Sequence, residues 1–181
     1  MTSLKPLRRL SSGSSGLDAM LGGGFPEGCA ILVSGAPGVG KTTLGLQFLV
    51  AGVNQGEAGL LVTFEQFPAS LVRDAHNLGW NLRTMEAAGQ LHLVFTSPEV
   101  FAHSLQAPDS PLSETLRAVA PQRAVIDSMA HLYRLTTNPI ELRSLFNAVV
   151  NGLKREGMTS LLLDEATRLF GAQSRHIGAL P

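Results

Sequence analysis

Residues 35–42 read Gly35-Ala36-Pro37-Gly38-Val39-Gly40-Lys41-Thr42 and match the pattern G-x-x-x-x-G-K-S/T at every fixed position. The apolar run Cys29–Ser34 precedes this stretch, and the amphipathic run Lys41–Asn54 follows it. A glycine-rich turn between a strand and a helix directs successive backbone N–H groups at one point, where the helix dipole adds positive charge. The stretch therefore predicts a phosphate-binding loop in an α/β protein.

The residues of this loop have separate predicted roles. Lys41 carries a flexible positive charge that reaches the β- and γ-phosphates of a nucleotide. The Thr42 hydroxyl is a hard oxygen ligand for Mg²⁺, and Thr43 is placed to donate to the α-phosphate. We therefore predict that ATP and Mg²⁺ bind here, with the nucleotide held by Gly35, Ala36, Pro37, Gly38, Val39, Gly40, Lys41, Thr42 and Thr43.

Two other nucleotide-binding patterns do not fit the sequence. A dinucleotide-binding fingerprint requires a glycine at the position that Thr43 occupies. A guanine-reading element of the type N-K-x-D occurs nowhere in the chain. The sequence therefore favours ATP over a dinucleotide or GTP.

Outward from the loop, short apolar runs alternate with amphipathic stretches. Nearly continuous apolar runs are typical of strands that are buried on both faces of a parallel sheet. Strands are predicted at Cys29–Ser34, Leu60–Phe64, Leu91–Thr96, Ala124–Asp127 and Thr159–Leu163, and helices at Lys41–Asn54, Pro68–Asn77, Ser110–Ala120 and Pro139–Arg155. Ligands of open α/β sheets bind at the carboxyl ends of the strands, so the polar residues at those ends are candidate site residues.

Two carboxylates lie at such strand ends. Asp127 ends an apolar strand some 85 residues after the loop and is predicted to hold the Mg²⁺ shell. Glu65 follows another strand and is predicted to orient the attacking water. The alternative for each is a solvated carboxylate with no part in chemistry.

The composition of the chain argues against several classes of protein. The chain has 181 residues and a formal net charge of zero, which argues against a nucleic-acid partner. Its one cysteine excludes an intramolecular disulfide. No apolar run reaches the roughly 18 residues of a membrane span and no signal peptide is recognisable, so we expect a cytoplasmic protein without a membrane partner.

A longer string surrounds these motifs. Residues 12–28 read SGSSGLDAMLGGGFPEG and lead into the loop strand; LVTFE at 61–65, LGWNL at 78–82 and VIDS at 125–128 follow. Together these segments resemble the KaiC-like branch of the RecA-type ATPases. The resemblance covers nearly the whole chain and is more specific than the phosphate loop alone.

The resemblance implies an α/β fold with a RecA-like core, a mostly parallel sheet with helices on both faces, and the strand order 3-2-4-5-1. It implies that Glu65 is the catalytic glutamate and Asp127 the Mg²⁺-associated acid. Asp164 falls where relatives carry a polar residue that senses the γ-phosphate. We expect one domain with a lead-in at 1–28 and an ATP-binding core at 29–170, followed by a disordered tail at 171–181.

The chain departs from the family pattern at three points. Gln66 stands where clock relatives often carry a second glutamate, and Ala166 where many carry arginine. The chain ends at Pro181, so we expect the family's last strands and their basic finger to be missing. Strand Cys29–Ser34 would then be an unpaired edge, which favours a homo-oligomer, in a ring or another arrangement.

The function that these residues predict is Mg²⁺-dependent ATP binding with slow hydrolysis, in which Glu65 and Lys41 are the catalytic residues. The hydrolysis would serve assembly or regulatory signalling, and a missing finger is expected to lower turnover. One alternative is a nucleotide-binding regulatory module with little or no turnover. Autokinase or protein kinase activity and a DNA recombination or repair ATPase rank below it.

Overall fold

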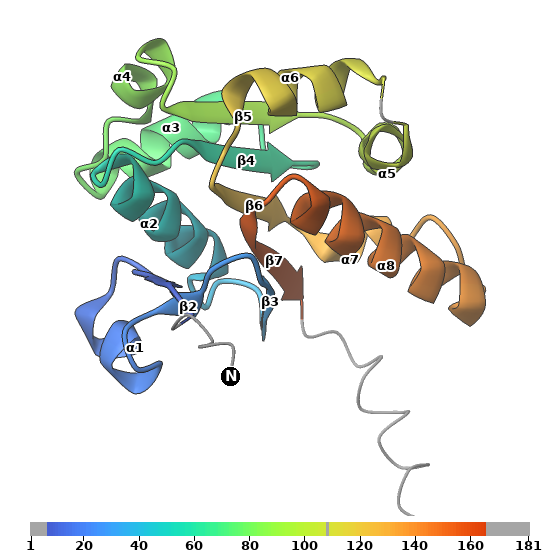
Figure 1. Ribbon diagram of the computed structural model, residues 1–181, viewed down its shortest axis with the longest axis horizontal. Helices are drawn as coiled ribbons and strands as arrows, with labels where there is room; N and C mark the ends of the chain where they lie inside the picture. The colour runs from blue at the N-terminus through green and yellow to red at the C-terminus, as the bar shows by residue number, and fades with distance from the viewer. Residues whose placement is uncertain (1–6, 108, 166–181) are drawn as a thin grey trace, which may run out of the picture.

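The computed structural model describes residues 7–107 and 109–165, and its centre is a five-stranded parallel sheet (Figure 1). Along the sheet the order is β3-β7-β6-β4-β5. Numbered along the chain, this is the predicted order 3-2-4-5-1, which is thereby confirmed. The strands are β3 (Ala30–Gly35), β4 (Gly59–Thr63), β5 (Leu91–Phe95), β6 (Arg123–Asp127) and β7 (Thr159–Glu165). The predicted tail at 171–181 and Ala166 lie outside the described residues.

Helices connect the strands and cover both faces of the sheet (Figure 1). The predicted helices are present, with boundaries shifted by a residue at some ends, and the structure adds short helices that the sequence analysis did not predict. Within the described residues, the helices are α1 (Ser15–Met20), α2 (Lys41–Val53), α3 (Pro68–Asn77), α4 (Leu82–Ala87), α5 (Pro98–Gln106), α6 (Pro111–Val119), α7 (Met129–Leu132) and α8 (Pro139–Arg155).

The core consists of two apolar clusters, one on each face of the sheet. Side chains of a strand alternate between faces, so Val62 and Ile126 enter one cluster while Leu61 and Val125 enter the other. The first cluster includes buried residues of α5, α6, α7 and α8, and the second includes those of α2, α3 and α4. Burial on both faces explains why the strands read as continuous apolar runs.

Strand β3 lies at one edge of the sheet, where its described neighbour is β7 alone. The expected edge position of the loop strand is therefore confirmed. Association of copies through this edge stays a prediction. Within the described residues, no helix is both long and apolar enough to cross a bilayer.

The lead-in folds against the core through a buried arginine. Arg123 on β6 is 0% exposed; its Nε donates to Glu57 at 2.6 Å, and its Nη1 donates to the carbonyl oxygens of Ser11 at 2.6 Å and Phe48 at 2.8 Å. Arg8 donates to the second oxygen of Glu57 at 2.8 Å. These bonds tie the lead-in, with its antiparallel pair β1 (Arg9–Leu10) and β2 (Phe25–Pro26), to α2 and β6.

Replacing Arg123 with Met is expected to lower the free energy of unfolding by about 3 kcal/mol, because Glu57 stays buried and, among the described residues, keeps the exposed Arg8 as its remaining ion-pair partner. Urea denaturation measures the loss. Arg83→Met is the matched control, since Arg83 is an exposed residue on α4, and it should change stability by less than about 0.5 kcal/mol. Equal losses in the two variants would contradict the proposed anchoring.

Candidate functional site

The phosphate loop joins the end of β3 to the start of α2. Gly38 and Gly40 have φ angles of 79° and 93°, in the left-handed region that favours glycine. Gly40 is also the residue that caps α2, which begins at Lys41. The path of the backbone therefore favours glycine both at Gly40, a fixed position of the motif, and at Gly38, a variable one. The turn places the N-terminus of a 13-residue helix at the loop.

Lys41 lies against its own loop. Its Nζ donates to the carbonyl oxygens of Gly35 at 2.8 Å and Ala36 at 2.9 Å. The positive charge is therefore held at the turn, where the helix N-terminus adds a partial charge of the same sign. This arrangement suits an anionic ligand.

Thr42 and Asp127 are brought together from positions 85 residues apart. The Thr42 hydroxyl donates to Oδ2 of Asp127 at 2.7 Å. Asp127 follows Val125 at the two-residue period of a strand, so it points toward the face that α2 covers. The two residues predicted to hold Mg²⁺ are thus in direct contact.

Burial raises the pKa of Asp127 above its ordinary value, and the Thr42 hydrogen bond and the charge of Lys41 only partly oppose that rise. A half-buried carboxylate beside a hydroxyl is the hard oxygen donor set that Mg²⁺ takes, usually together with phosphate oxygens and water. The described residues contain no cluster of three or more His, Cys, Asp or Glu side chains suited to a metal ion. Thr42 and Asp127 therefore fit a Mg²⁺ that is held jointly with a nucleotide.

Glu65 lines a cavity of about 360 Å³ that Thr42 and Asp127 also line. Its side chain is 78% exposed and approaches Nε2 of His131 at 3.1 Å. The cavity lies at the carboxyl ends of β4, β6 and β7, as expected because the carboxyl ends of parallel strands meet at one edge of the sheet. It is lined by Thr42, Thr63, Glu65, Gln66, Asp127, Ser128, His131 and Glu165.

Two residues that line the cavity were not predicted from the sequence: Glu165, at the end of β7, and His131, on α7. Asp164 is 1% exposed and lies on the face of Leu162, whereas Glu165 alternates to the face of α2 and lines the cavity. Burial raises the pKa of Asp164, and burial together with the charge of Asp164 raises the pKa of Tyr133 to about 12. The γ-phosphate-sensing role of Asp164 stays a prediction.

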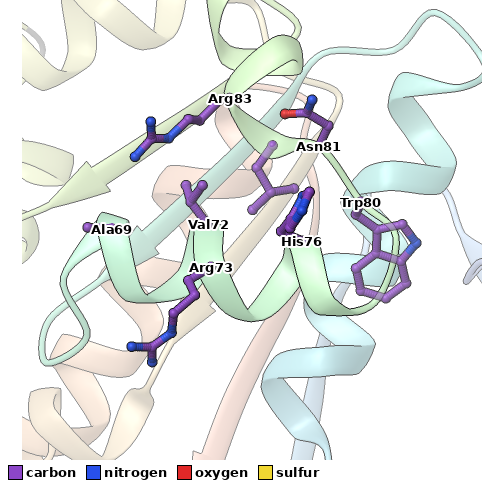
Figure 2. Close-up of a pocket in the computed structure, with 8 residues that line it drawn as sticks. Ala69, Val72, Arg73, His76, Trp80, Asn81 and Arg83 are labelled. Carbon is purple, nitrogen blue, oxygen red and sulfur yellow. The ribbon is translucent and has the colours of Figure 1, made fainter.

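A second cavity of about 360 Å³ lies between α3 and α4, away from the loop (Figure 2). Trp80 lies at one end of it, and the guanidinium groups of Arg73 and Arg83 lie toward the other (Figure 2). The ring of Trp80 packs against the cluster on the α2 face of the sheet. The second cavity contains none of the predicted nucleotide or metal residues.

Comparison with known proteins identifies the family to which the chain is similar. The family model described as "ATPase: KaiC" matches residues 10–178. A UPF0273 protein of Methanopyrus kandleri is 32% identical over 88% of this chain and 68% of its own length. A circadian clock oscillator protein KaiC of Rippkaea orientalis is 37% identical over 92% of this chain and 31% of its own length.

Among solved structures, the KaiC-like protein PH0186 of Pyrococcus horikoshii superposes with a TM-score of 0.77 and 31% identity, covering 89% of this chain and 72% of that one. The chain spans about a third of the length of the clock proteins that it matches. The family match extends over most of the chain and includes the loop, Glu65 and Asp127. The chain therefore belongs to the KaiC family of ATPases.

Proposed function

We propose that this chain binds ATP together with Mg²⁺ and hydrolyses it slowly. The observation that carries the proposal is the 2.7 Å hydrogen bond between Thr42 and Asp127, in a cavity that also contains Glu65. This bond joins the phosphate loop to the acid at the end of β6. A metal bound between them would neutralise charge on the phosphate oxygens.

The groups of the chain have separate roles in this proposal. Lys41 and the N-terminus of α2 attract and orient the phosphates. The carboxylate of Glu65 holds a water for attack on the γ-phosphate and accepts its proton. Phosphoryl transfer depends mostly on positioning and charge stabilisation, so these groups support turnover, and the exposure of Glu65 is consistent with a slow rate. We propose that the turnover serves assembly or regulatory signalling.

Removing Mg²⁺ is expected to weaken ATP binding at least about tenfold, because Asp127 then faces the phosphates without a cation between them. Calorimetric titration of ATP with Mg²⁺ and with EDTA measures the difference. In Asp127→Asn the two titrations should agree within about twofold, because the carboxylate no longer contributes to the metal site. Asp74→Asn, at an exposed ion pair on α3, is the control and should keep the full Mg²⁺ effect. Equal ATP affinities for the unmodified chain in both buffers would contradict the predicted metal site.

A second candidate function is a nucleotide-binding regulatory module with little turnover. The exposure of Glu65 favours it, since a solvated carboxylate is poorly fixed for catalysis. The presence of Gln66 in the same cavity favours it too, because an amide positions water but does not take its proton. Phosphate release separates this module from the enzyme.

A further inference from the structure

We propose that His131 is a positioning residue that holds the carboxylate of Glu65 in place for the attack of water. The inference rests on the proposed hydrolysis and adds a residue to it. Among the described residues, His131 is the hydrogen-bond partner that the structure gives the Glu65 side chain, with Nε2 at 3.1 Å from Oε2. A flexible carboxylate thereby acquires a defined direction.

The two partners differ in how firmly they are held. The Glu65 side chain is 78% exposed, whereas that of His131 is 17% exposed. An exposed glutamate samples several rotamers, and each rotamer that turns the carboxylate away from the cavity is unproductive. The imidazole is therefore the fixed partner and the carboxylate the one that is held.

The packing of α7 explains why the imidazole is fixed. His131 lies between Met129 and Leu132, which are both fully buried and anchor this short helix in the core. The ring also packs on Phe64, with centroids 6.1 Å apart, and Phe64 in turn packs on Phe101 at 5.6 Å. The residue before Glu65 and the imidazole that contacts Glu65 therefore belong to one packed cluster.

The same helix begins two residues after Asp127, the predicted metal acid, at the end of β6 (Figure 1). His131 thus links the position of Glu65 to the strand that carries Asp127. A neutral imidazole with its proton on Nε2 donates to Oε2 of Glu65 and leaves Oε1 available to accept a hydrogen bond from water. His131 itself exchanges no proton with the substrate in this arrangement.

The first test measures turnover and ATP affinity in His131 variants. His131→Ala is expected to lower kcat about 3- to 10-fold, the effect of one exposed hydrogen bond, with ATP affinity within about twofold of the unmodified chain. His131→Gln retains an N–H donor at similar reach and should recover most of the loss. In Glu65→Gln, adding His131→Ala should lower kcat no further. His76→Ala, in the second cavity, is the matched control and should leave kcat unchanged.

The second test needs no turnover. In chain labelled with ¹⁵N-histidine, with both proteins held at about pH 8, Glu65→Ala should move the Nε2 resonance of His131 but not that of His76. If the Nε2 resonance of His131 does not move, the contact between His131 and Glu65 is contradicted, whether or not the His131 variants fold. The positioning role is contradicted if His131→Ala has a normal kcat, or if His131→Ala lowers kcat equally in the unmodified chain and in Glu65→Gln. Neither result contradicts the proposed hydrolysis. Turnover that is absent or insensitive to Glu65→Gln overturns the proposed function as well.

Discussion

Replacing Lys41 with Ala is expected to weaken MgATP binding by at least about 100-fold, because it removes the positive charge that we propose contacts the β- and γ-phosphates. Calorimetric titration, or displacement of a fluorescent ATP analogue, measures the loss. The ammonium group donates hydrogen bonds to two loop carbonyl groups, at 2.8 and 2.9 Å, and to no core side chain among the described residues, so the fold should persist without it.

The control for this variant is Lys154→Ala. Lys154 is exposed in the last turn of α8, far along the chain from the loop, and its replacement removes the same charge from the molecule. ATP affinity should stay within about twofold, because screening by salt weakens the effect of a distant surface charge. Unchanged affinity in Lys41→Ala would show that the glycine-rich turn is not the nucleotide site.

Replacing Glu65 with Gln is expected to lower kcat at least about 100-fold while ATP affinity changes little. The amide keeps the size of the side chain and its contact with water but does not accept the proton of the attacking water. Single-turnover phosphate release, measured with protein in excess of ATP, separates this chemical step from nucleotide binding. Glu86→Gln, at an exposed position on α4, removes the same charge and should leave the rate unchanged.

This variant also separates the two candidate functions. A loss of phosphate release confined to Glu65→Gln supports the enzyme. Equal, substantial rates in the unmodified chain and in Glu65→Gln would contradict the assignment of Glu65, whereas negligible rates in both would favour the regulatory module. Retained ATP binding in both proteins would show that the loop functions independently of the glutamate.

The sheet was predictable because burial on both faces leaves a simple signal. β4, for example, is buried throughout, and its sequence GLLVT has no polar residue until its last position. The short helices gave no such signal. α4 has six residues and α7 has four, and helices of this length form only where the surrounding core fixes them. The lead-in likewise depends on Arg123, whose bonds to Ser11 and Glu57 span 112 and 66 positions.

The candidate site was partly predictable for a similar reason. Asp127 ends β6 and Glu65 lies two residues beyond the end of β4 in the same parallel sheet, so their meeting at one edge follows from the order of the elements. His131 was missed because its place depends on packing against Phe64, and no spacing in the sequence records that contact. Glu165 was missed because adjacent residues of a strand point to opposite faces of the sheet. The prediction named Asp164, whereas its neighbour Glu165 is the residue that lines the cavity.

The central claim is that this chain hydrolyses ATP at the cavity that the loop, Asp127 and Glu65 share. Phosphate release by the purified chain in MgATP tests it most directly. We expect sustained release beyond one phosphate per chain, reduced to background in Lys41→Ala. Release at the background level from a chain that binds MgATP would contradict it.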